Sequence, residues 1–254
     1  MTLRRRVRDL VTDVTVAFGF YTRIPVSRSV EGPELARAGW AAPPVGAIIG
    51  FIGATVYWLG YAVGLPVFAE AAAALAATMW VTGCLHEDGL ADTLDGFGGG
   101  TTRERKLEIM RDSRIGAYGA CALMLSLLLR GTAIASIAQP RPVLVALITA
   151  HASARSTIPM FMRLVPAARS DGLSAAAGRP PHGSALVAAA LGAVALVLGL
   201  GPLKGIIALA VLASSMSLIG WFCIKQIGGQ TGDVLGALEQ MSEIAVLLIA
   251  AAHR

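Results

Sequence analysis

Residues 203–223 read LKGIIALAVLASSMSLIGWFC, a run of 21 residues whose one charged side chain is Lys204. A helix needs about 20 predominantly apolar residues to cross the hydrocarbon core of a bilayer. This run therefore predicts a membrane-spanning helix, and it sets the expected fold class of the chain.

Six further apolar runs of similar length accompany it. The chain of 254 residues is 55% hydrophobic and only 15% charged, whereas a soluble domain has about 25% charged residues. We predict an all-α, polytopic helical bundle that forms a single membrane-embedded domain over residues 1–254, with about seven spans. The other six expected spans are Ala42–Leu65, Pro66–Cys84, Gly116–Ala138, Val143–Val165, Ser184–Gly201 and Val234–Ala252.

The N-terminal segment differs from these runs. Arg4, Arg5, Arg6 and Arg8 open the chain, and Leu10–Tyr21 is too short and too polar to span, with Asp13 inside it. We expect an amphipathic helix on the membrane surface, where the arginines meet anionic lipid headgroups. No small-residue cleavage site follows, which argues against a signal peptide.

The loop charges predict the orientation. With a cytoplasmic N-terminus, the loops 85–115, 166–183 and 224–233 lie inside and the tight Pro/Gly turns lie outside. The expected inside residues are Arg103, Arg105, Lys106, Arg111, Arg114, Arg169, Arg179 and Lys225, and the outside ones are Arg141 and Lys204. This asymmetry follows the positive-inside rule. We interpret the net charge of +5 as an orientation signal, with no nucleic-acid partner, in a bacterial inner membrane.

Acidic residues gather directly after the second run. Residues 85–100 read LHEDGLADTLDGFGGG, and Asp88, Asp92 and Asp95 stand at positions i, i+4 and i+7 of one helix face, with Glu87 on its edge. Such closely spaced carboxylates repel one another unless a cation binds. Oxygen ligands favour Mg²⁺, Mn²⁺ or Ca²⁺ over zinc. A solvated acidic helix start is the alternative, but the glycines between the acids favour a site.

Two further polar groups follow. Residues 109–119 read IMRDSRIGAYG, in which Arg111 and Arg114 could hold phosphate oxygens and Asp112 could bind a cation or pair with one. His151 and Arg155 stand one turn apart at membrane depth, where ionisable residues usually face a cavity or the bundle interior. Arg155 could also simply pair with an acid.

The last polar group is Lys225 to Asp233, KQIGGQTGD. Gly228 and Gly229 let backbone N–H groups wrap an anion next to the following helix N-terminus, with Thr231 and Asp233 at hand. Asp233 would also be a good helix N-cap, and that structural role competes with a catalytic one. Glu239 and Glu243, one turn apart, indicate a buried polar face.

These residues resemble a known family. HEDGLADTLDG at residues 86–96, IMRDSRIGAYG at 109–119, GGQTGDVLGA at 228–237 and FYTRIPV at 20–26 are similar to cobalamin synthases, the adenosylcobinamide-GDP ribazoletransferases. The similarity runs from about residue 10 to the end of the chain.

The resemblance implies a reaction, a cofactor and site residues. Adenosylcobinamide-GDP and α-ribazole, or its 5′-phosphate, would be joined with release of GMP by a Mg²⁺-dependent membrane enzyme. Glu87, Asp88, Asp92 and Asp95 would bind the metal. His86, Asp112, Arg114 and Arg155 would be catalytic, while Arg111, His151, Gly228, Gly229, Thr231 and Asp233 would bind substrate. The active site would face the cytoplasm, and a homo-oligomer is left open.

Two other readings stay open at this point. A CDP-alcohol-type phosphotransferase also uses clustered aspartates, but Asp92 stands where its motif has alanine and the following arginine is absent. A cation transporter could use the acids as an ion path. Against that reading, the acids cluster at one end of the spans.

Overall fold

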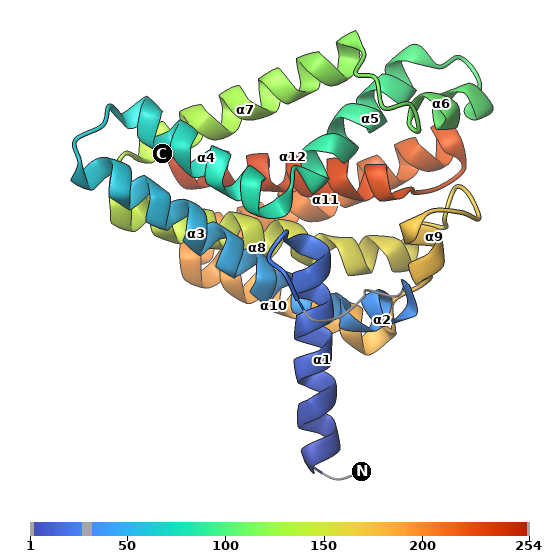
Figure 1. Cartoon of the computed structure of the whole chain (residues 1–254), viewed down its shortest axis with the longest axis horizontal. Coiled ribbons are helices and arrows are strands. Elements are labelled where there is room, and N and C mark those ends of the chain that lie inside the picture. Colours follow the sequence, from blue (N-terminus) through green and yellow to red (C-terminus); the bar gives the residue numbers. More distant parts are fainter. Residues whose placement is uncertain (1–2, 27–31, 253–254) are drawn as a thin grey trace.

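A computed structural model describes residues 3–26 and 32–252. Within them the chain forms twelve α-helices and one short 3-10 helix, and Ala167 and Gln230 make an isolated backbone bridge. Figure 1 shows a bundle of long helices that lie roughly side by side. The expected all-α helical bundle is therefore confirmed.

Among the described residues, six helical stretches are long and apolar enough to cross a membrane. They are α2 with α3 (Gly32–Ala62 including the 3-10 helix η1, Ala38–Ala41), α7 (Ala117–Ile137), α8 (Pro140–Leu164), α10 (His182–Leu200), α11 (Pro202–Ile227) and α12 (Gly232–Ala251). The protein is an integral membrane protein. Five of the seven expected spans match these helices within a few residues, and the first expected span, Ala42–Leu65, matches a longer helical stretch that begins at Gly32.

The expected span Pro66–Cys84 has a different form. Helix α4 (Val67–Thr82) has 16 residues, and it meets α5 (Leu85–Gly99) at a bend of 90°. The pair counts as a seventh span only when both helices are taken together. Gly83 and Cys84 both have left-handed backbone, with φ of 64° and 58°, so the α-helical path cannot continue through them.

The acidic stretch therefore lies on a helix that turns away from α4. The segment after α1 packs against this corner, because the Arg23 backbone N–H donates to the Val81 carbonyl at 2.7 Å. The Arg23 side chain occupies the space where a Cβ on Gly83 would lie. The corner thus fixes the start of α5.

Helices α8 and α12 form the centre of the bundle. Helix α8 packs against α3, α10 and α12, and α12 also packs against α5, α7 and α11. Two apolar clusters fill the space between helices, one around Phe161 and Leu238 and the other around Leu147 and Val246. Between these clusters, α8 and α12 each present two buried ionisable side chains, His151 and Arg155 on α8 and Glu239 and Glu243 on α12.

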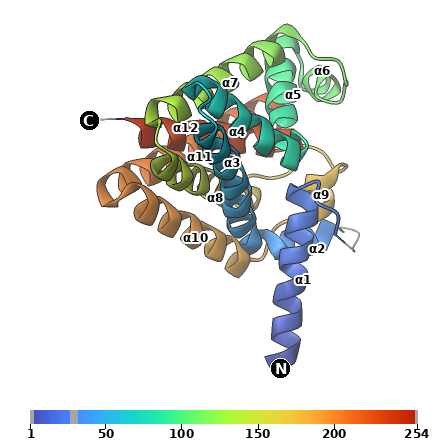
Figure 2. The same cartoon turned by 60° about the vertical axis from the view of Figure 1, so that its left-hand side comes forward.

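Close helix contacts explain the paired glycines of α3. A Cβ on Gly46 or Gly50 would collide with the backbone carbonyls of His151 and Leu147 on α8. The small-residue spacing thus permits the packing that it predicts. In Figures 1 and 2, helix α1 (Leu3–Tyr21) crosses the direction of the bundle, and helices α6 (Arg103–Ile109) and α9 (Leu173–Ala177) lie at the end opposite the C-terminus.

Candidate active site at the crossing of α5 and α12

Two glycines set the distance between α5 and α12. A Cβ on Gly89 would lie 2.8 Å from the Asp233 carbonyl oxygen, and one on Gly236 would lie 3.2 Å from the Cα of Gly89. The backbones can approach this closely only without side chains at these positions. The crossing brings Asp88 and Asp92 of α5 toward Asp233 of α12, so that the charges of Asp88 and Asp233 both act on Asp92.

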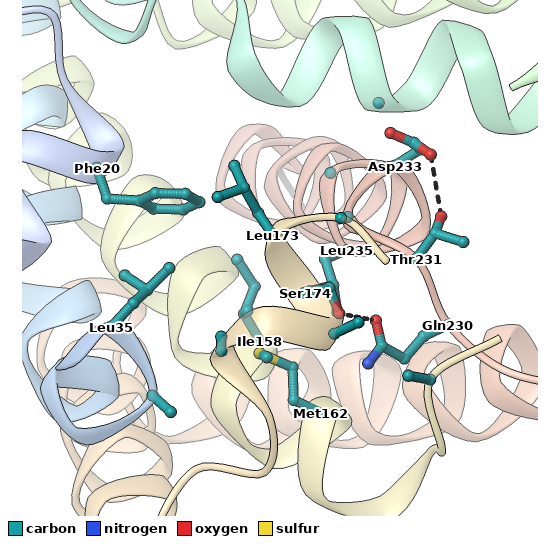
Figure 3. A pocket seen from close by; sticks show the side chains of 18 of the residues that line it. Phe20, Leu35, Ile158, Met162, Leu173, Ser174, Gln230, Thr231, Asp233 and Leu235 are labelled. Atoms are coloured by element: carbon teal, nitrogen blue, oxygen red, sulfur yellow. Dashed lines mark hydrogen bonds between the residues drawn. The ribbon is translucent and has the colours of Figure 1, made fainter. Parts of the chain in front are cut away.

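A cavity of about 270 Å³ opens beside this crossing. Asp88, Thr231, Asp233 and Arg169 line its polar part. Figure 3 shows Asp233 and Thr231 at one end and the apolar side chains of Phe20, Leu35, Ile158 and Met162 toward the other. Residues of α1, α2, α5, α8, α9 and α12 line the cavity, so its walls come from nearly the whole length of the chain.

Thr231, and not Asp233, is the N-cap of α12. Its hydroxyl oxygen accepts from the Val234 N–H at 3.3 Å, and the hydroxyl lies 3.1 Å from the Asp233 carboxylate. The competing structural role for Asp233 is therefore taken by its neighbour. This leaves the Asp233 carboxylate at the cavity, 3.6 Å from the guanidinium of Arg169.

A buried ionic cluster lies next to the cavity, between the two apolar clusters. The guanidinium of Arg130 on α7 bridges Glu87 and Glu243 at 3.1 Å each. The Arg155 guanidinium lies 2.6 Å from Glu239, and His151 lies 3.0 Å from Glu243. Each of these side chains is at most 7% exposed. Burying charges requires this kind of pairing, because unpaired ions lose their hydration without compensation.

One group in the described part of the chain has tightly grouped metal-ligand atoms. His151, Glu239 and Glu243 present such atoms within 4.8 Å of one another. However, the guanidiniums of Arg155 and Arg130 already neutralise the two glutamates. The cluster is thus better described as an ion-pair network than as a cation site.

The four predicted metal ligands have separate surroundings. Glu87 faces Arg130 inside the bundle. The Asp95 carboxylate accepts the N–H groups of Gly116 and Gly119 at 2.7 and 2.8 Å, so it satisfies donors at the start of α7. The side-chain carboxylates of Asp88 and Asp92 make no hydrogen bond or ion pair with a described residue. Only these two of the four are free to serve a ligand in the cavity region.

The predicted catalytic residues are also divided. His86 lines the cavity, and its Nδ1 lies 3.3 Å from the Arg155 guanidinium, but Arg155 itself is buried behind it. Asp112 and Arg114 pair with each other at 2.6 Å in the exposed segment before α7. The hydrogen bonds from the Arg114 side chain and backbone lower the pKa of the Asp112 carboxyl to about 2.

The predicted substrate-binding residues lie in three places. Thr231 and Asp233 line the cavity, whereas His151 is buried against Glu243. Arg111 pairs with Asp171, a residue at the cavity, at 2.7 Å. Gly228 ends α11 with a left-handed φ of 84° and its N–H bonds to Ile224, and neither it nor Gly229 lines the cavity.

Comparison with known proteins identifies the family. The family model for cobalamin-5-phosphate synthase matches residues 13–251. The chain belongs to this family. A relative from Bradyrhizobium diazoefficiens, named adenosylcobinamide-GDP ribazoletransferase, is 52% identical over 250 residues, which cover 98% of this chain and 96% of the relative. A relative of the same name from Mesorhizobium japonicum is 51% identical, and the match covers 96% of this chain and 94% of the relative. Another from Azorhizobium caulinodans is 43% identical, and the match covers 94% of this chain and 95% of the relative.

No solved structure matches the chain significantly. The family assignment therefore rests on sequence similarity. The assignment favours the synthase reading over the CDP-alcohol-type enzyme and the cation transporter.

No role was predicted from the sequence for Arg169 at the cavity or for Arg130 in the buried ionic cluster. Arg169 lines the cavity next to Asp233, and one of its buried guanidinium nitrogens has no hydrogen-bond partner among the described residues. It stands in a loop, where a lone arginine carries no motif. Arg130 could have been found, because an arginine in the middle of an apolar run is costly unless acids face it.

Proposed function

We propose that this protein joins the phosphocobinamide part of adenosylcobinamide-GDP to α-ribazole, or to its 5′-phosphate, with release of GMP. This would be the final assembly step of the cobamide nucleotide loop. The shared name of the relatives supports the reaction. The observation that carries it is that Asp88, Asp233 and the Arg169 guanidinium line one cavity, with Asp92 close enough for the charges of Asp88 and Asp233 to act on it.

The transfer exchanges one bond at phosphorus for another. A ribose hydroxyl oxygen forms a bond to the phosphorus that carries the cobinamide, and the bond from that phosphorus to the oxygen of GMP breaks. The hydroxyl proton passes to a base on the enzyme, for which His86 at the cavity is the candidate, because the carboxylates would be engaged by the metal. Arg169 is placed to hold phosphate oxygens, since a guanidinium matches their geometry.

The carboxylates of Asp88, Asp92 and Asp233 suit a magnesium ion in their chemistry. Their oxygens are the ligands that Mg²⁺ prefers, and Asp88 and Asp92 have no competing cationic partner among the described residues. Asp88, Asp92 and Asp233 would hold it, and it would supply neutralisation of phosphate charge. Glu87 and Asp95 are left out of this set because Arg130 and the α7 backbone already bind them.

We place the protein in a bacterial inner membrane with this site facing the cytoplasm. The support is the charge of the loops, because the end of the bundle with α6 and α9 contains most of the basic loop residues. The α1 helix crosses the bundle direction, as a helix on the membrane surface would.

Purified protein, adenosylcobinamide-GDP, α-ribazole and Mg²⁺ form the direct test of the reaction. Mass detection should find one cobamide and one GMP for each turnover. Asp88→Ala and Asp92→Ala should abolish both products while the purified protein keeps its helical content by circular dichroism. Formation of neither product by the wild type would overturn the proposal, and full activity of both variants would overturn the site.

A further inference from the structure

The cavity is divided into an apolar end and a polar end. Phe20 of α1, Leu35 of α2, and Ile158 and Met162 of α8 line the apolar end, and Figure 3 shows Leu173 of α9 opposite Phe20. No charged side chain stands among these five. Asp233 and Thr231 mark the polar end.

Two polar groups between the two ends are paired with each other. The Ser174 hydroxyl donates to the Gln230 side-chain oxygen at 2.6 Å, and both residues are buried. A guanine base has keto and amino groups that would lose hydrogen bonds to water on entering the apolar end. A flat aromatic base without such groups would bind there at no comparable cost, with the Phe20 ring beside it.

The volume of the cavity also restricts its occupant. About 270 Å³ is near the lower limit of small-molecule sites, about 300 Å³. A whole corrinoid with its nucleotide is far larger than this, whereas one nucleoside is of suitable size.

We propose that the apolar end binds the benzimidazole base of α-ribazole and directs its ribose toward Asp88 and Asp233. This inference rests on the proposed function and assigns the cavity to the acceptor substrate. The corrinoid nucleotide then approaches the same carboxylates from the Arg169 side. Phe20, Leu35, Ile158 and Leu173 become the residues that select the lower-ligand base.

A cavity-filling variant distinguishes the binding site of α-ribazole from that of adenosylcobinamide-GDP. Leu173 is 63% exposed, so Leu173→Trp can enlarge the side chain at the apolar end without disturbing the core. Leu164→Trp is the matched control, because Leu164 is 68% exposed and does not line the cavity. We expect Leu173→Trp to raise the KM for α-ribazole about tenfold or more, to leave the KM for adenosylcobinamide-GDP unchanged, and the control to change neither.

A cavity-enlarging variant tests the same site in the opposite direction. Ile158→Ala should increase the relative kcat/KM for acceptor nucleosides whose base is larger than dimethylbenzimidazole. The inference is overturned if Leu173→Trp raises the KM for the corrinoid nucleotide instead, or if both variants leave acceptor kinetics unchanged.

Binding without turnover distinguishes failure of this inference from failure of the reaction. Equilibrium dialysis measures the affinity of the wild type and of Leu173→Trp for α-ribazole alone. If the wild type forms no cobamide, the reaction is wrong, and at least tenfold weaker binding by the variant would still support the subsite. Equal binding by both proteins, or binding by neither, overturns it.

Discussion

Asp88 and Glu87 are neighbours in the chain but have opposite surroundings. Successive residues on an α-helix point about 100° apart, so Glu87 enters the bundle, where it is 5% exposed, and Asp88 is exposed at the cavity. Glu87 pairs with Arg130, whereas Asp88 has no such partner among the described residues. One carboxylate thus stabilises the fold, and its neighbour is available for chemistry.

Removal of the Arg130 charge should destabilise the protein strongly. Arg130→Met leaves Glu87 and Glu243 without their shared cation in the interior, which costs about 3–5 kcal/mol when a buried pair is broken. The thermal unfolding midpoint in detergent should fall clearly. Arg114→Ala is the control, since both partners of the Arg114 pair are exposed and such pairs contribute little. Equal midpoints for the two variants would contradict the role of Arg130.

Titration of the Asp112 carboxyl should not contribute to the pH dependence of activity near neutral pH. Its folded-state pKa, about 2, lies below the value of about 3.9 for an unperturbed aspartate. A lowered pKa gives stability that is present above the unfolded value and lost as pH falls through the folded one. Asp112 therefore stays ionised from about pH 5 to 9. Rate–pH profiles of the wild type and Asp112→Asn should have the same shape over that range, and loss of an acidic limb in the variant would contradict this.

At the scale of elements, the crossing of α5 and α12 assembles the site. The same two helices carry the candidate ligands and the contacts to the ionic cluster. Their close approach depends on Gly89 and Gly236. The glycines of the acidic motif thus serve helix packing here, where the sequence suggested space for a ligand.

Gly236→Ala should lower both stability and activity. The new Cβ would lie 3.2 Å from the Cα of Gly89 and from the His86 carbonyl oxygen, and backbone atoms cannot rotate away. Overpacking of this kind costs about 1–3 kcal/mol. Thermal unfolding and GMP release measure the two effects.

Gly183→Ala is the matched control for that substitution. A Cβ added to Gly183 in α10 would meet no described atom within 4 Å, and alanine favours helix over glycine by about 1 kcal/mol. The stability of this variant should stay equal to that of the wild type or rise. A Gly236→Ala protein as stable and active as this control would show that the crossing is not tightly packed.

The sequence allows the spans to be predicted better than their connections. Apolar runs mark α7, α8, α10, α11 and α12, because burial in lipid demands length and hydropathy that are visible locally. The helical spacing also predicts one face for Asp88 and Asp92. The proximity of Asp92 to Asp233, the cap that Asp95 provides for α7, and the bend at Gly83 depend on contacts between distant segments. Such contacts between distant segments cannot be predicted from a local sequence pattern.

At the scale of the whole molecule, the two ends of the bundle contain different parts of the chain. The turn between α3 and α4 lies at the same end as the C-terminus in Figure 1, and α6 and α9 lie at the other. The long connecting loops and the cavity residues Arg169 and Asp233 belong to the second end. In the proposed orientation, soluble substrates would reach the site from one side of the membrane.

Reporter fusions at the C-terminus test the proposed orientation. With seven spans and a cytoplasmic start, the C-terminus lies outside. Alkaline phosphatase fused there should be active, and a green fluorescent protein fused there should be dark. The same reporters inserted after Ser170, in the loop between α8 and α9, should give the reverse. Bright fluorescence at the C-terminus would contradict the orientation.

The central claim is that Asp88, Asp92 and Asp233 act together at the α5–α12 crossing. The most direct measurement is the rate of GMP release against Mg²⁺ concentration for the wild type, Asp92→Asn and Glu87→Gln. We predict that the wild type is inactive in a metal chelator and is saturated by Mg²⁺. Asp92→Asn should need at least about tenfold more Mg²⁺, because even the loss of a group that only supports a metal ligand costs about 10–100-fold in metal affinity. Glu87→Gln should keep the wild-type requirement despite lower stability. The same rate with and without chelator, or the same Mg²⁺ requirement in Asp92→Asn as in the wild type, would contradict the claim.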